Sequence, residues 1–348
     1  MFDYFERSNI DRTFEKRMDF TFVGGPSYSS TTNLSLGLLA AGLYRTDRSD
    51  SLASRSDISL FANVSISGYY YVGISGNTFF NRDRHRLEFE TGFRSRPSLW
   101  WGTGYEAAVN NAAATLTSKR YAADIRYKYR LAGRFHAGVS VGFDSSRAYR
   151  LSRPEYLDGE RGEYTAAELG IFAEYDSRDV VTQPFRGCCV SVAGVVLPSW
   201  MSNCGRTLWR AEITAAGYLP VWRGGVLAAE FYGRFSSRGT PWSLNSQLGG
   251  GMRMRGYYEG RFNDLNMIEM QLEWRQRIWR RIGCVLWAGA GNVFGTDGLM
   301  LRRTLPNYGA GLRWELKKRM NIRVDCGFGK KIAGRRINGF IMSLNEAF

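Results

Sequence analysis

The sequence predicts an all-β fold, and three observations support this prediction. Aromatic residues make up 14% of the 348 residues, and 40 glycines accompany only 8 prolines, a composition typical of β proteins. Apolar and polar residues alternate with a period of two over most of the chain. The alternating segments are about ten to fourteen residues long, whereas strands of soluble sheets average roughly five or six. We therefore predict a transmembrane antiparallel β-barrel of about sixteen strands.

The alternation predicts which side chains face lipid and which face the barrel lumen. Over residues 120–131, Tyr121, Ile125 and Tyr127 would lie on one face and Arg126 on the other. The apolar faces carry aromatic residues near their ends, as the interfacial girdles of membrane barrels do, and charged residues are tolerated in a wet lumen. The same pattern recurs at residues 86–94, 209–215, 268–275 and 322–328.

The order of strands and connections is typical of such a barrel. In the second half of the chain, long connections alternate with tight turns such as Arg223-Gly224-Gly225, so we expect long extracellular loops and short periplasmic turns. The first half is less regular, because residues 46–56 form a long connection where a turn is expected. Residues 1–16 are polar and should lie outside the barrel, which would occupy residues 17–348. We expect strands to begin near residues 17, 31, 57, 68, 86, 119, 134, 163, 186, 205, 224, 265, 283, 305, 320 and 337.

Hydropathy excludes a membrane-spanning helix. The longest uncharged stretches, residues 23–44 and 187–205, are interrupted by Gly, Pro, Ser, Thr and Asn. A membrane protein with this sequence would therefore have to be a barrel. Residues 1–7 are charged and lack an apolar core, so no secretory signal is visible, and a barrel would then be a processed or trimmed chain.

Charge and cysteine content limit the partners. The formal net charge of +15 fits a lumen that attracts acidic segments, or loops that contact lipopolysaccharide. No recognition helix or zinc finger accompanies this charge, so we expect no nucleic-acid partner. The cysteines have no Cys-x-x-Cys spacing and no histidine partner, which indicates neither a metal site, a disulfide framework nor a cofactor. They are Cys188, Cys189, Cys204, Cys284 and Cys326.

One long loop stands out among the connections. Residues 249–260 read Gly-Gly-Gly-Met-Arg-Met-Arg-Gly-Tyr-Tyr-Glu-Gly, between the eleventh and twelfth expected strands. The leading glycines permit backbone conformations that other residues avoid. A long loop that carries its own arginines and aromatic residues is expected to dock against the protein and to carry function.

Two further motifs lie elsewhere in the chain. Between the eighth and ninth expected strands, Asp176, Arg178 and Asp179 are followed by Pro184 and Gly187 in a turn. The chain ends in an alternating segment with one apolar face and a final aromatic residue. That face consists of Phe340, Met342, Leu344 and Phe348.

Together the three motifs resemble the outer-membrane insertase and secretion superfamily, also called the bacterial surface antigen family. Its barrel has sixteen strands, and its sixth extracellular loop folds into the lumen with a Val-Arg-Gly-Phe/Tyr motif. Arg255, Gly256 and Tyr257 match that motif, with Met254 in place of Val. The resemblance covers about residues 17–348 and implies insertion or translocation of outer-membrane and surface proteins.

The resemblance implies a lumen anchor for the loop. Arg255 would pair with acidic residues on the inner wall of the twelfth to fifteenth strands, because an unpaired buried charge is costly. Glu273 and Asp325 lie on predicted lumen faces and are the candidates. The family usually has an Asp on the thirteenth strand, and residues 287–291 contain no acid.

The resemblance also implies a lateral seam where the first strand closes against the last, near Phe340 and Phe348. The first strand contains Gly24, Gly25 and Pro26, which weaken a strand, since proline lacks the ladder donor. A weak first strand would lower the cost of opening the seam and expose an edge for a client strand. The alternative is that these residues simply form a strand end or a bulge.

Three functions remain open at this stage. The first is an insertion or translocation factor that works with unfolded clients and accessory subunits. The second is a structural barrel or passive pore subunit of a larger complex. Residues 1–16 cannot hold the periplasmic domains that the family normally carries, so the chain would be either the barrel part of a longer protein or a natural barrel-only member.

The third is a barrel enzyme, which is disfavoured, and we predict no catalytic residues. The chain has two histidines, His85 in a turn and His136 on a predicted lumen face with Ser140 and Asp144. A spacing of four along a strand separates residues by about 13 Å, too far for direct hydrogen bonds between a nucleophile, a base and an acid.

Overall fold

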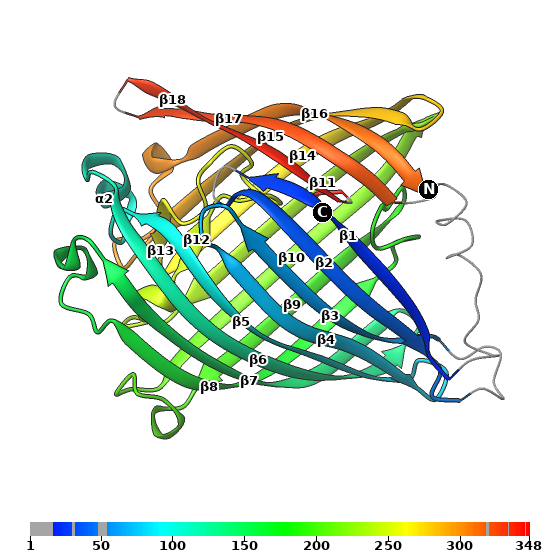
Figure 1. The fold of residues 1–348 in the computed structure, drawn as a ribbon, viewed down its shortest axis with the longest axis horizontal. Helices are drawn as coiled ribbons and strands as arrows, with labels where there is room; N and C mark the ends of the chain where they lie inside the picture. Colours follow the sequence, from blue (N-terminus) through cyan, green and yellow to red (C-terminus); the bar gives the residue numbers. More distant parts are fainter. Residues whose placement is uncertain (1–16, 30–31, 48–53, 318–319, 333, 345) are drawn as a thin grey trace.

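The computed structural model describes residues 17–29, 32–47, 54–317, 320–332, 334–344 and 346–348. The polar segment predicted to lie outside the barrel, residues 1–16, falls outside the described residues. Figure 1 shows tilted strands that follow one another around a single closed wall.

The wall is a closed antiparallel barrel of sixteen strands, which confirms the predicted fold class. Each strand pairs with its neighbour along the chain, except that β11 pairs with β14 across a long loop and β1 closes against β18. The strands are β1 (Asp19–Ser29), β2 (Asn33–Tyr44), β3 (Ser56–Ser65), β4 (Tyr70–Phe80), β5 (His85–Trp100), β6 (Ala114–Ala132), β7 (Phe135–Leu151), β8 (Glu163–Asp176), β9 (Gly187–Leu197), β10 (Leu208–Trp222), β11 (Gly225–Ser236), β14 (Asn266–Trp279), β15 (Ile282–Phe294), β16 (Leu305–Lys317), β17 (Met320–Ile332) and β18 (Arg335–Leu344).

Burial alternates along the strands as the sequence pattern predicts. On β14, Met270 and Leu272 are more than 45% exposed on the outer face, while Glu269 and Glu273 are buried on the lumen side. On β6, Ile125 is exposed on the outer face. Apolar side chains thus face outward and the charged ones line an interior, the arrangement of a barrel in lipid. Among the described residues, no helix has the length and hydropathy to cross a membrane.

The connections contain the few other elements. Helix α2 (Tyr105–Asn110) was not predicted from the sequence, and β6 begins five residues before the expected position. The helix has a single fully buried residue, Ala108, which packs among residues of the long loop, so its formation depends on tertiary contact. The remaining short elements are the 3₁₀ turns η1 (Pro154–Leu157), η2 (Ser199–Met201), η3 (Trp242–Leu244) and η4 (Leu301–Arg303) and the strand pair β12 (Ser246–Leu248) and β13 (Phe262–Asp264).

The barrel closes through a very short ladder. Among the described residues, β1 and β18 pair only at Tyr28↔Met342 and Ser29↔Ile341. The shortest of the other strand pairs of the wall, β3 with β4 and β8 with β9, each have eight residue pairs. The alternative that Gly24, Gly25 and Pro26 end or bulge the first strand is wrong, because β1 runs through them in unbroken register with β2.

Candidate functional site

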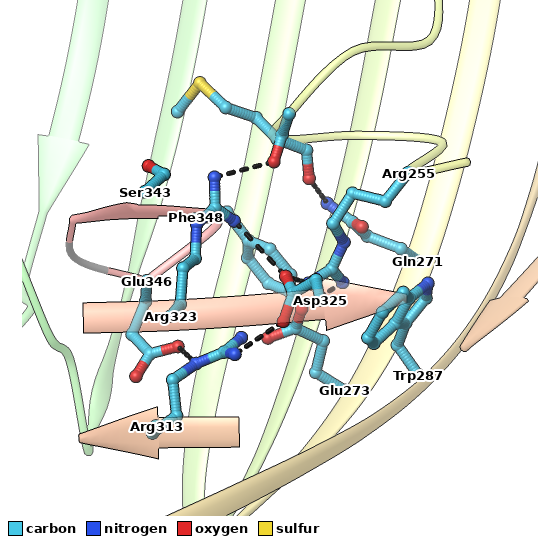
Figure 2. A network of polar contacts seen from close by, with 12 residues as sticks. Arg255, Gln271, Glu273, Trp287, Arg313, Arg323, Asp325, Ser343, Glu346 and Phe348 are labelled. Atoms are coloured by element: carbon cyan, nitrogen blue, oxygen red, sulfur yellow. Dashed lines mark hydrogen bonds and ion pairs between the residues drawn. The ribbon is translucent and has the colours of Figure 1, made fainter. Parts of the chain in front are cut away.

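The loop between β11 and β14 turns back into the lumen. The β12–β13 ladder forms its base, and Gly249 and Gly250 reverse the chain with φ of 102° and 115°, a region that favours glycine. Beyond this reversal, Met254, Arg255 and Tyr257 are almost completely buried. Figure 2 shows Arg255 directed at side chains of the inner wall.

Arg255 forms the centre of a buried charge network. Its guanidinium pairs with Glu273 on β14, and its Nη1 donates to Asp325 Oδ2 on β17 at 2.9 Å (Figure 2). All three side chains are 0% exposed. The two carboxylates compensate the charge of the buried guanidinium, whereas any one of the three alone would be costly to bury.

The thirteenth strand of the wall, β15, supplies an aromatic ring instead of an acid. The Arg255 guanidinium carbon lies 3.8 Å from the centre of the Trp287 ring, a cation–π contact. Trp287 Nε1 donates to Asn307 Oδ1 at 2.9 Å, and the Asn307 amide donates to the main-chain oxygen of Arg255. The sequence signal for this contact was a lone Trp on a lumen face, where a large apolar residue is unexpected.

Gly256 and Tyr257 fit closely against β16 and β17. Gly256 has φ of 110°, and a Cβ atom there would lie 2.6 Å from the carbonyl carbon of Gly327. The Tyr257 hydroxyl donates to Pro306 O at 2.7 Å and accepts from the Lys330 amide at 2.8 Å. Burial raises the pKa of Tyr257 to about 12, so the phenol stays protonated as a donor.

Three cationic side chains extend this network and were missed by sequence reasoning. Arg275 Nε donates to Glu273 Oε2 at 2.8 Å, and Arg313 Nη1 donates to Asp325 Oδ1 at 2.5 Å. Arg323 Nη2 donates to the main-chain oxygen of Gly251 at 2.7 Å, from the β17 wall to the loop. Alternation places Arg275 and Arg323 on lumen faces, but only the curvature of the barrel brings them and Arg313 to the carboxylates that hold Arg255.

The predicted turn motif is a self-contained structure between β8 and β9. Arg178 Nη2 donates to Asp176 Oδ2 at 2.7 Å, and Asp179 Oδ1 accepts from the Phe185 amide at 2.9 Å. Pro184 is buried, and Gly187 has φ of 101° where the strand resumes. The five motif residues thus lie in or at the ends of one connection, and Arg178 pairs with Asp176 there.

The seam residues divide into two groups. Phe340 is on the outer face, where its ring lies 5.7 Å from that of Tyr28, so it lies at the β1–β18 junction. Phe348 does not share its face: β18 ends at Leu344, and the chain turns into the lumen. There Phe348 contacts Tyr218 and Arg275, so the prediction that it lines the seam is corrected.

The hydrolase constellation does not assemble. Asp144 pairs with Arg120 and accepts from Ser146, and the two ring nitrogens of His136 have no hydrogen-bond partner among the described residues. A cavity of about 540 Å³ in the lumen is lined by β4–β8 and β10. Its walls carry both signs of charge, including Glu90 and Arg94.

Comparison with known proteins identifies the family. A family model described as the Omp85 superfamily domain matches residues 58–348. A comparison with curated protein sequences found no match.

Among solved structures, BamA from Haemophilus ducreyi lacking POTRA domains 1–3 has a TM-score of 0.66 at 14% identity, over 94% of this chain and 70% of that one. CdiB from Acinetobacter baumannii has a TM-score of 0.62 at 12% identity, over 95% of this chain and 60% of that one. CdiB from Escherichia coli has a TM-score of 0.63 at 11% identity, over 94% and 63%. The chain thus spans less than two thirds of the two CdiB chains, and these likenesses establish a shared barrel fold.

Proposed function

This chain belongs to the Omp85 superfamily of integral outer-membrane β-barrels, and on that premise we propose that it inserts or translocates outer-membrane and surface proteins. The site of action is the seam between β1 and β18. The observation that carries this proposal is the ladder at that junction, which has two residue pairs among the described residues. Along Asp19–Ser27 the described part of β1 has β2 as its only ladder partner, so its other edge can pair with an added strand.

The composition of β1 supports a seam that opens at low cost. Pro26 lacks a ladder donor, and around Gly25 no atom lies within 4 Å of the position of a Cβ. Outside the seam, Phe20 and Phe22 are more than 60% exposed toward lipid. A client strand that pairs with this edge would enter the membrane directly, with its apolar face already in lipid.

The loop motif has a different role in this proposal. Arg255, Gly256 and Tyr257 anchor the loop to the wall of β14–β17, so this wall stays closed while the opposite edge of β18 separates from β1. Glu273 and Asp325 are the anchoring carboxylates. The turn of Asp176, Arg178, Asp179, Pro184 and Gly187 stabilises the β8–β9 connection.

The proposed partners follow from this mechanism. They are outer-membrane lipid and lipopolysaccharide around the wall, unfolded outer-membrane protein clients at the seam, and accessory assembly subunits. Residues 17–348 act as one barrel domain without enzymatic activity or nucleic-acid binding.

A seam-locking experiment tests the proposal. Tyr28→Cys with Met342→Cys joins two residues that face each other in the ladder. We expect the oxidised barrel, reconstituted in vesicles, to lose insertion of a urea-unfolded barrel client and to regain it on reduction. Equal insertion by the locked and reduced forms would contradict a lateral seam mechanism.

One observation favours a second function, a structural barrel or passive pore subunit. The 540 Å³ cavity has charged residues in its lining and would hold water and ions. A steady conductance in planar bilayers, together with no stimulation of client insertion, would support this alternative.

A further inference from the structure

Two arginines lie side by side on the lumen face of β5 and β6. Arg94 is the register partner of Arg120, and like charges directly opposite each other destabilise a sheet. Arg120 pairs with Asp144. Arg94 forms no side-chain hydrogen bond or ion pair within the part of the chain that the structure describes. The pair of arginines therefore has one carboxylate where two would be needed to compensate its charge.

A third arginine, Arg96, lies two residues further along β5 and on the same face, because side chains of a strand alternate. Its Nη1 donates to Glu259 Oε1 of the long loop at 3.1 Å. Its Nε is buried and has no hydrogen-bond partner among the described residues. Three guanidinium groups thus meet two carboxylates, those of Asp144 and Glu259, and one positive charge of the cluster is left over.

The three arginines line a small cavity between the wall and the loop. Its volume is about 50 Å³, and Ser243 of η3 belongs to its lining. The Ser243 hydroxyl is buried and lacks a hydrogen-bond partner among the described residues. A buried polar group without a partner is costly, so this cavity favours a polar occupant. A single water needs roughly 10–15 Å³, so there is room for a larger group than water.

The small cavity adjoins the 540 Å³ cavity of the lumen, because Arg94 and Arg120 line both. The acidic side chains that line the larger cavity all have partners. The pairs are Glu88 with Lys128, Glu90 with Tyr71, Asp124 with Arg126, Asp144 with Arg120 and Glu168 with Arg210. The charge that stays without a partner is therefore the cation Arg94, at the place where an occupant can pass from one cavity to the other.

The chemistry of this cluster is that of an oxyanion site. A guanidinium presents its N–H groups in a planar fork that matches the oxygens of a phosphate or carboxylate. We propose that the 50 Å³ cavity binds one phosphate-sized oxyanion through Arg94, Arg96 and Arg120, either as a free ion or as the terminal phosphate of a molecule that lies in the larger cavity. The bound oxyanion would join the loop to the wall of β5 and β6. This inference does not require insertase activity, because binding is measured directly.

Thermal unfolding of the full chain in detergent micelles tests the proposal. Sodium phosphate is titrated against sodium chloride at matched ionic strength, because salt also screens charges without binding to a site. An anion that binds only the folded barrel raises its unfolding midpoint. We expect a saturable rise for the wild type and a phosphate affinity at least tenfold weaker for Arg94→Gln. Glycerol 3-phosphate is the second ligand: a rise with phosphate alone identifies a free ion, and a rise with both identifies the phosphate of a larger molecule.

Arg126→Gln is the matched control. Arg126 also lines the 540 Å³ cavity, but it pairs with Asp124 and does not line the small cavity. Its phosphate affinity should stay within twofold of that of the wild type. The proposal is overturned if the wild type shows no saturable rise, if Arg94→Gln keeps the wild-type affinity, or if the two variants lose affinity equally.

Arg94→Gln also provides a test without ligand. The change removes a like charge next to Arg120 and breaks no ion pair among the described residues. In phosphate-free buffer the variant should therefore fold, with an unfolding midpoint equal to or above that of the wild type. A lower midpoint would show that Arg94 has a structural partner, and it would overturn the assignment of Arg94 as the cation that is free to bind an anion.

Discussion

The two strands of the last hairpin, β17 and β18, differ in how they contact the rest of the barrel. On one side, the β14–β17 wall holds the loop motif through a buried network of charged, amide and aromatic side chains around Arg255. On the other side, β18 joins β1 through two residue pairs in the part of the chain that the structure describes. The strongly held wall of β14–β17 therefore lies next to the junction that we propose to open.

The largest expected effect comes from breaking the closed region at its centre. Arg255→Ala would leave Glu273 and Asp325 buried with one cation fewer, at a cost of about 3–5 kcal/mol in the free energy of unfolding. Urea unfolding in detergent micelles measures this. The control is Arg261→Ala in the same loop, which loses a hydrogen bond to Ala108 O and no carboxylate. If the two substitutions lower the free energy of unfolding equally, Arg255 is not the centre of the network.

A smaller effect on the free energy of unfolding is expected from a change in the backbone next to Arg255. Gly256→Ala adds a Cβ 2.6 Å from Gly327 and strains a φ of 110°, which we expect to cost roughly 2–3 kcal/mol. Gly159→Ala separates the two causes, because Gly159 also has a positive φ but no atom within 4 Å of the added Cβ. If both variants unfold at the same urea concentration, the close approach to β17 contributes nothing.

The two regions should also be coupled through Glu346, which follows β18. Glu346 and Arg255 share Asp325 through Arg313, so Arg255→Lys and Glu346→Gln should be non-additive by about 1 kcal/mol in a double-mutant cycle. The cycle of Arg255→Lys with Glu168→Gln, which lies outside this network, should be additive. Additivity in both cycles would mean that the loop and Glu346 are held independently.

The smallest effect is expected at the weak edge itself. Gly25→Ala meets no atom within 4 Å and should stabilise the barrel by roughly 0.4–1 kcal/mol through the unfolded chain. If the seam acts as proposed, the same change should reduce client insertion, since a stiffer β1 exposes its edge less often. If Gly25→Ala stabilises the barrel and leaves client insertion unchanged, the composition of β1 does not affect the function of the seam.

Periodicity along the chain was sufficient for the barrel, because the outward and inward faces of a strand depend on neighbours in sequence. Fifteen of the expected strand starts lie within three residues of the observed ones; the exception is β6, whose first residues extend a ladder with the end of β5. Helix α2 was missed for a related reason, since its one buried residue packs against the distant long loop.

For the candidate site, the sequence identified Arg255 and the two carboxylates that the structure brings to it, because alternation places Glu273 and Asp325 on lumen faces. It did not identify Trp287, Asn307 or the three supporting arginines as contacts. Their positions depend on which strands the curved wall brings face to face across the lumen. The sequence by itself thus determined the fold class and the side of each strand, since these follow from local spacing, and its resemblance to the family implied that the loop enters the lumen. Only the tertiary structure decided that β1 and β18 form two residue pairs among the described residues and that Phe348 lies in the lumen, because Arg275 and Arg313 meet Phe348 and Glu346 through contacts between residues far apart in the sequence.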